Sequence, residues 1–147
     1  MTCLECKKEL SYLDHRKAIE LFDVELCTAH RTRLERLMKF HKTSAEAIIL
    51  YYGLRQAGIK AMLAWWDGTK TVELAVSRVR LNIEIDLCRE PLSVEQALEE
   101  LEEAMHSYHD GYTTLRIPHF LVRTHLKDTV ETILGIVAGL KTTLKAV

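Results

Sequence analysis

Two short pairs of cysteine and histidine residues near the start of the chain constrain its fold more than any other sequence feature. Cys3 and Cys6 are separated by two residues, and Cys27 and His30 repeat this spacing after an insert at residues 7–26. The short gap lets both side chains of a pair reach one ion, and structural zinc takes four nitrogen or sulfur ligands in a tetrahedron. The spacing therefore predicts a structural zinc site, because a closed shell leaves no position for a reactive water.

The residues after the second pair have the spacing of a helix. Leu34, Leu37 and His41 recur at helical intervals. A knuckle, an insert and a ligand pair at a helix start are typical of a treble-clef-like zinc finger. Two alternatives stay open at this point. The cysteines are unrelated buried thiols, or His15 replaces His30, although no ligand stands at pair spacing from His15.

The use of cysteine also indicates the cellular compartment in which the protein is expected. The chain starts without a charged segment followed by an apolar one, and no stretch has the length of a membrane span. We therefore expect a cytoplasmic protein that contacts no membrane, in which paired cysteines bind metal. Cys88 stands alone, and we interpret it as a small thiol rather than a nucleophile because no histidine accompanies it.

Charge is spread unevenly, although the formal net charge is only −1. Such a small net charge makes a nucleic-acid partner less expected without excluding one. The charged residues of 30–42 are basic apart from Glu35, and those of 84–103 are acidic apart from Arg89. Both stretches can also be read as solvated helix faces. If the basic stretch binds DNA, its candidate contacts are Arg31, Arg33, Arg36 and Lys39.

A change in composition near residues 40–44 divides the chain into a zinc-finger module with a basic helix, 1–42, and a second domain, 43–147. The second domain begins with a capping box, Thr43 to Glu46, and a helix that continues to about Gly58. Alternating or apolar stretches then predict strands, and stripes of apolar residues predict helices. The expected strands are 60–66, 70–76, 79–86 and 112–117, with Asp67-Gly68 as a hairpin turn, and the expected helices open at Ser93 and span 126–140. This order predicts an α/β domain around one sheet.

Acidic residues share one face of two expected strands. If Ser77-Arg78 is a two-residue hairpin turn, Glu73 faces Asn82 and lies diagonal to Glu84. Asp86 continues this face, and Glu46 at the preceding helix start can point to the same place. Converging carboxylates suit Mg²⁺ or Mn²⁺, which can activate water for phosphodiester cleavage. The alternative is the polar face of a half-exposed sheet.

The stretch from Ser44 to Gly139 resembles the PD-(D/E)XK superfamily, and within it the small endonuclease-like domains related to very-short-patch repair nucleases. The resemblance rests on residues 66–76, 81–86, 96–98 and 111–118. It implies a restriction-endonuclease-like mixed sheet flanked by helices, behind the N-terminal zinc finger, and a metal-dependent DNA endonuclease. If the roles of the family's acidic residues apply to this sequence, Glu73 and Glu84 bind Mg²⁺ or Mn²⁺, and Asp86 and Glu46 assist as catalytic acids.

The departures from that family favour a second hypothesis. Asp86 stands where the superfamily has lysine, although relatives in this branch also carry aspartate there. Leu87 to Pro91 replaces the usual glycine and glutamine-histidine segment. Glu102 and Glu103 make the following helix less suited to a phosphate backbone. The alternative is therefore a catalytically eroded module that binds DNA or a protein partner without cleavage. A plain dimeric scaffold is a third hypothesis.

Overall fold

A computed structural model describes residues 1–66, 71–87 and 113–145. The elements are α1 (Tyr12–Phe22), α2 (Thr28–His41), α3 (Ala45–Gln56), β1 (Met62–Trp66), β2 (Thr71–Val76), a 3₁₀ turn η1 (Ser77–Val79), β3 (Leu81–Asp86), β4 (Thr113–Pro118), α5 (His119–Thr124) and α6 (Leu126–Lys145). The predicted α/β class is confirmed. The predicted Asp67-Gly68 turn and the helix opening at Ser93 lie outside the described residues.

The four strands form one mixed sheet in the order β1-β2-β3-β4. β1 and β2, and β2 and β3, are antiparallel, whereas β3 and β4 are parallel. Leu74 pairs with Ile83, and both are fully buried. The predicted alternation is therefore confirmed, with Leu74 and Ile83 on the core face and Glu73 and Glu84 on the other.

The register between β2 and β3 differs from the predicted one. Ser77 to Val79 form a 3₁₀ turn and Arg80 adopts a left-handed conformation with φ of 51°, so the connection is longer than the predicted two-residue turn. Asn82 consequently pairs with Ala75 instead of Glu73. The shift is by two residues, and an even shift leaves each side chain on its predicted face.

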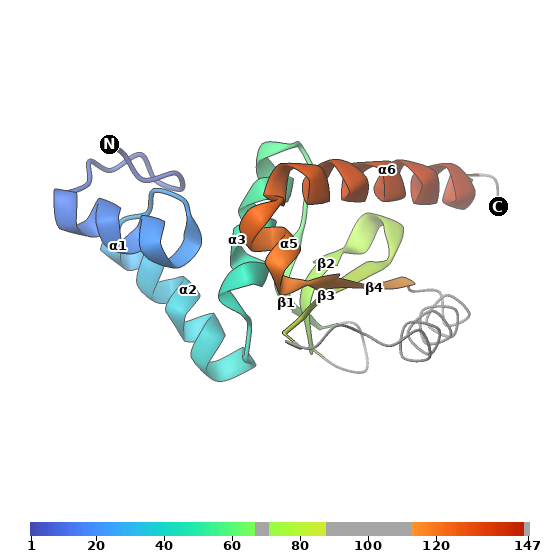
Figure 1. Ribbon diagram of the computed structural model, residues 1–147, viewed down its shortest axis with the longest axis horizontal. Coiled ribbons are helices and arrows are strands. Elements are labelled where there is room, and N and C mark those ends of the chain that lie inside the picture. The colour runs from blue at the N-terminus through green and yellow to red at the C-terminus, as the bar shows by residue number, and fades with distance from the viewer. Residues whose placement is uncertain (67–70, 88–112, 146–147) are drawn as a thin grey trace.

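Helix α3 lies between two hydrophobic cores. Ile48 and Tyr52 belong to a core with Phe22 of α1 and Leu34 of α2. Leu50, on another side of α3, belongs to the core formed with the sheet, α5 and α6. Figure 1 shows α1 and α2 to one side of α3, and the sheet with α6 to the other. A helix buried on several sides explains why apolar residues occupy most positions of α3.

The start of α3 differs from the predicted capping box by one residue. Ser44 is the N-cap, and its hydroxyl oxygen accepts a hydrogen bond from the backbone N–H of Ala47. Thr43 is buried and precedes the cap. Glu46 therefore occupies the second helical position, from which it does not reach back as the acid of a capping box does.

Candidate metal centre

The four predicted zinc ligands converge. The ligand atoms of Cys3, Cys6, Cys27 and His30 all lie within 4.8 Å of one another. The Sγ atoms of Cys6 and Cys27 are 3.8 Å apart, and Nδ1 of His30 lies 3.7 Å from Sγ of Cys3 and 3.1 Å from Sγ of Cys27. For zinc bonds of about 2.3 Å to sulfur and about 2.0 Å to nitrogen, tetrahedral edges are about 3.8 Å and about 3.5 Å. The group therefore has the donor set and spacing to hold zinc.

A tight turn presents the first ligand pair. Thr2 bridges to Glu9, the N–H of Cys3 donates to the carbonyl of Lys8 at 2.8 Å, and the N–H of Lys7 donates to the carbonyl of Cys3 at 2.9 Å. Lys7 adopts a φ of 64°, which reverses the chain directly after Cys6. The two-residue gap predicted a turn of this kind.

The start of α2 presents the second ligand pair. Cys27 is the N-cap residue, and His30 lies in the first turn. The backbone N–H of Leu4 donates to the carbonyl of Glu25 at 2.8 Å, which ties the first turn to the approach of the second pair. A metal here joins the N-terminal turn to the start of α2.

The surroundings favour the thiolate form of Cys27. The backbone N–H of His30 donates to Sγ of Cys27, and this bond is the main reason that the pKa of Cys27 is lowered to about 6. Burial opposes the shift, and the hydrogen bonds of the His30, Cys3 and Cys6 side chains add to it. The thiolate is the form that binds metal.

The alternative fourth ligand is placed elsewhere. Nε2 of His15 lies 3.1 Å from Oε1 of Glu25, outside the group of ligand atoms. The interpretation of three unrelated thiols does not fit either, because Cys3 and Cys27 are both buried and face the same point as His30.

The basic residues of α2 divide into two environments. Arg31 is only 8 % exposed and lies near Asp14 of α1 and Glu35, at 3.9 and 3.5 Å. This placement suits packing between helices more than contact with a phosphate. The other three candidate contacts, Arg33, Arg36 and Lys39, are exposed.

Glu73 is held by three hydrogen bonds. Its Oε2 accepts from the Ser44 hydroxyl at 2.7 Å and from the Ser44 backbone N–H at 3.1 Å, and its Oε1 accepts from the N–H of Ile85 at 3.3 Å. Regular pairing of β2 with β3 stops at Leu74 and Ile83, so the Glu73 carboxylate replaces the next strand partner. It thereby joins the start of α3 to β3.

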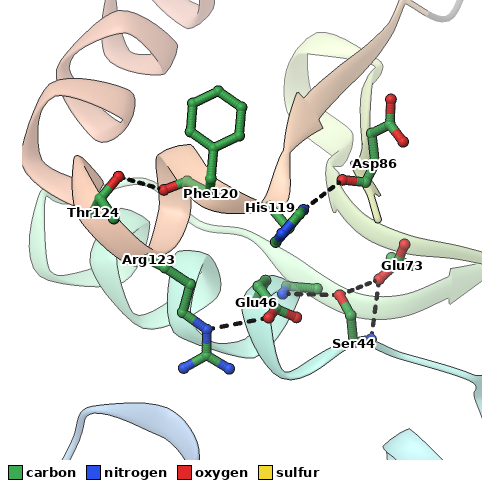
Figure 2. Close-up of polar contacts among 9 residues, drawn as sticks. Ser44, Glu46, Glu73, Asp86, His119, Phe120, Arg123 and Thr124 are labelled. Atoms are coloured by element: carbon green, nitrogen blue, oxygen red, sulfur yellow. Dashed lines mark hydrogen bonds and ion pairs between the residues drawn. The ribbon is translucent and has the colours of Figure 1, made fainter. Parts of the chain in front are cut away.

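The other three acids have separate surroundings. Glu46 Oε1 accepts from Nε of Arg123 at 3.1 Å (Figure 2). Glu84 lies 3.6 Å from Nε of Arg116. The backbone carbonyl of Asp86 lies 3.4 Å from Nδ1 of His119. Among residues 1–66, 71–87 and 113–145, the cysteine-histidine group is the one place where three or more metal-type ligand atoms meet. The described positions of these acids therefore do not form the expected metal shell.

Two residues at this end of the sheet were given no functional role from the sequence. Figure 2 shows His119 and Arg123 of α5 close to the acids of α3 and β3. The sequence signal that could have indicated a role for His119 is its position directly after the strand that ends at Pro118. Polar residues that follow parallel strands gather at one edge of a sheet. Nothing in the local spacing marked Arg123 as the partner of Glu46.

No family model matches the chain, and no curated protein or solved structure matches it. In the part of the chain that the structure describes, no helix is both long enough and apolar enough to cross a membrane.

Proposed function

We propose that this protein is a zinc-stabilised binding module that holds DNA through α2, and that its nuclease-like domain binds without cleaving. The zinc is structural in this proposal. It fixes the start of α2 against the N-terminal turn, so that the helix presents its exposed cations from a rigid support.

The observation that carries the proposal is the exposure of three basic side chains on α2 that form no ion pair with a described residue. Arg33, Arg36 and Lys39 are spaced by three residues, exposed, and form no ion pair with a described residue. Cations at this spacing follow one side of a helix. Each of them can neutralise a phosphate, and such contacts supply affinity that depends on salt and little on sequence.

The hydrogen bonds and ion pairs of the acidic residues support binding without cleavage. The Glu73 carboxylate accepts three hydrogen bonds, and Glu46 is paired with Arg123. A metal at Glu73 competes with these three hydrogen bonds, and a metal at Glu46 competes with Arg123 for the same carboxylate. The departure at Leu87 to Pro91 points the same way, because it removes the segment that the resemblance leads one to expect.

The test is DNA binding to the zinc-loaded protein, measured by fluorescence anisotropy on a short labelled duplex at several salt concentrations. The variant Arg33→Ala/Arg36→Ala should bind more weakly, with a salt slope that is smaller in magnitude by about 2. The matched control Lys127→Ala/Lys141→Ala removes two exposed cations from α6 and should keep the slope of the unmodified protein. Equal loss in both variants, or no binding at all, contradicts the proposal.

The second candidate is the metal-dependent endonuclease, in which Glu73 and Glu84 bind Mg²⁺ or Mn²⁺. It is favoured by the position of Glu46, Glu73, Asp86 and His119 at one end of the sheet (Figure 2). Incubation with plasmid and either ion separates the two candidates. Cleavage by the unmodified protein that disappears in Glu84→Ala would replace binding without cleavage as the function.

A further inference from the structure

A groove of about 280 Å³ lies between α2 and the start of β1. The helix contributes His30, Arg33, Leu34 and Leu37, which follow one side of α2 at intervals of three and four residues. The opposite wall is the chain from Ala61 to Leu63, and Tyr51 and Tyr52 of α3 close the groove. The groove is therefore bounded by one helix and one strand.

The strand wall is an open edge. β1 is the first strand of the sheet and pairs with β2 on one side only. In the described ranges, no backbone hydrogen bond joins the other side of β1 to a further segment. Met62 on this strand is 45 % exposed. An edge of this kind offers unpaired N–H and C=O groups to an incoming extended chain.

The charge of the groove favours an acidic occupant. Arg33 is exposed and has no ion-pair partner among the described residues. The carboxylate of Glu5 also lines the groove, but it already forms an ion pair with Arg55. The remaining lining from Leu34, Leu37 and Leu63 is apolar, which suits alternate side chains of an extended segment.

We propose that the groove between α2 and β1 binds an extended acidic segment of a partner protein, which adds to the sheet as a strand beside β1. Its backbone pairs with Met62 and Leu63, its apolar side chains enter the groove, and an acidic side chain meets Arg33. Strand addition at an open edge takes its affinity from backbone hydrogen bonds and its specificity from pockets for alternate side chains.

A peptide is favoured over nucleic acid at this place. Among the described residues that line the groove, Arg33 is the one arginine or lysine, and it has no ion-pair partner in the described part of the chain. The carbonyl groups of a strand edge also repel phosphates. The surface proposed for DNA extends to Arg36 and Lys39, which do not line the groove. The two proposals share Arg33 and differ in every other contact, so each can fail alone.

The experiment uses the zinc-loaded full chain and three pools of labelled octapeptides. In the first pool glutamate alternates with apolar residues, in the second lysine replaces glutamate, and in the third the acidic peptides are N-methylated at alternate positions. We expect only the first pool to bind, and to shift the amide NMR signals of Met62 and Leu63. Equal binding of the N-methylated pool, or unchanged signals of these amides, overturns strand addition.

Charge reversal separates recognition from damage to the fold. Arg33→Glu should weaken binding of the acidic pool by about tenfold and should create binding of the lysine pool. Lys127→Glu, at an exposed position of α6, should leave the acidic pool unaffected. If the Arg33→Glu variant does not bind the lysine pool, Arg33 is not the residue that meets the acidic side chain of the partner. A short duplex or single strand that shifts the same amides and displaces the acidic pool assigns the groove to nucleic acid and overturns the peptide.

Discussion

The two polar clusters of this protein are built in opposite ways. In the N-terminal turn and α2, the ligand atoms of Cys3, Cys6, Cys27 and His30 lie within 4.8 Å of one another. At the end of the sheet, the Glu73 carboxylate accepts hydrogen bonds from Ser44 and Ile85. The first arrangement can hold a metal ion, whereas the hydrogen bonds of the protein itself satisfy Glu73.

This difference distinguishes a ligand site from a structural polar network. Thiolates so close together repel one another unless an ion or protons intervene. A carboxylate that accepts hydrogen bonds from backbone and hydroxyl groups is stable without an ion, and it stabilises the elements that it joins. Convergence of four sulfur and nitrogen ligand atoms within 4.8 Å is therefore the stronger indication of metal binding.

The largest expected effect comes from removing a zinc ligand. Cys3→Ser should lose stoichiometric zinc and most of the order of residues 1–41, because structural zinc contributes on the order of 10 kcal/mol in small zinc modules. Zinc content by mass spectrometry and amide NMR measure the two effects. The matched control Cys88→Ser should keep its zinc, and a Cys3→Ser protein with unchanged zinc and signals would break the comparison.

Glu73→Ala should have the next largest effect. It leaves the N–H groups of Ser44 and Ile85 without their acceptor, so we expect a loss of about 2–4 kcal/mol in the free energy of unfolding. Glu46→Ala is the control and should cost about 1 kcal/mol or less, because its partner Arg123 is partly exposed. Urea titration measures both. If Glu73→Ala stabilises the protein, Glu73 resembles a metal-binding acid relieved of repulsion.

A smaller effect distinguishes the two kinds of arginine on α2. Arg36→Met should reduce the magnitude of the salt slope of DNA binding by about 1, because it removes an exposed cation. Arg31→Met should leave that slope unchanged, since Arg31 is buried beside Asp14 and Glu35. Its free energy of unfolding should fall by about 1 kcal/mol or less, because the carboxylates of Asp14 and Glu35 that lose their partner are 33 % and 44 % exposed and remain solvated. The reverse pattern would assign the phosphate contact to Arg31.

The smallest expected change in the free energy of unfolding comes from an exposed ion pair on α1. Arg16 and Glu20 form an ion pair of 3.0 Å on α1, with both side chains 62 % exposed. Glu20→Ala should cost less than about 0.5 kcal/mol, because solvent and salt screen such pairs. A cost comparable with that of Glu73→Ala would remove the distinction between buried and exposed carboxylates.

Local spacing accounts for the parts of the fold that the sequence predicted well. The ligand pairs, the helix after His30 and the start of the helix near Ser44 each depend on residues within one or two turns of the chain. The α1 helix lies inside the predicted insert and was not anticipated. The buried residues of α1 are Ala18 and Phe22, so its stripe of apolar side chains is short.

Contacts between distant residues account for what the sequence did not predict. The left-handed conformation of Arg80 changed the register of β2 and β3, and arginine is not a residue that signals this conformation. The partners of Glu73 and Glu46 come from residues far away in the chain, Ile85 and Arg123. No periodicity in one segment reveals such partners.

The sequence by itself determined which four cysteine and histidine side chains converge, the α/β class and the face on which each strand residue lies. These features follow from turn spacing and from the two-residue period of a strand, which survives an even shift of register. Only the tertiary structure decided that Glu73 joins α3 to β3, that Arg31 is buried, and that α2 and the open edge of β1 form a groove. Those features depend on how separate elements pack, and packing brings together residues whose spacing along the chain carries no signal.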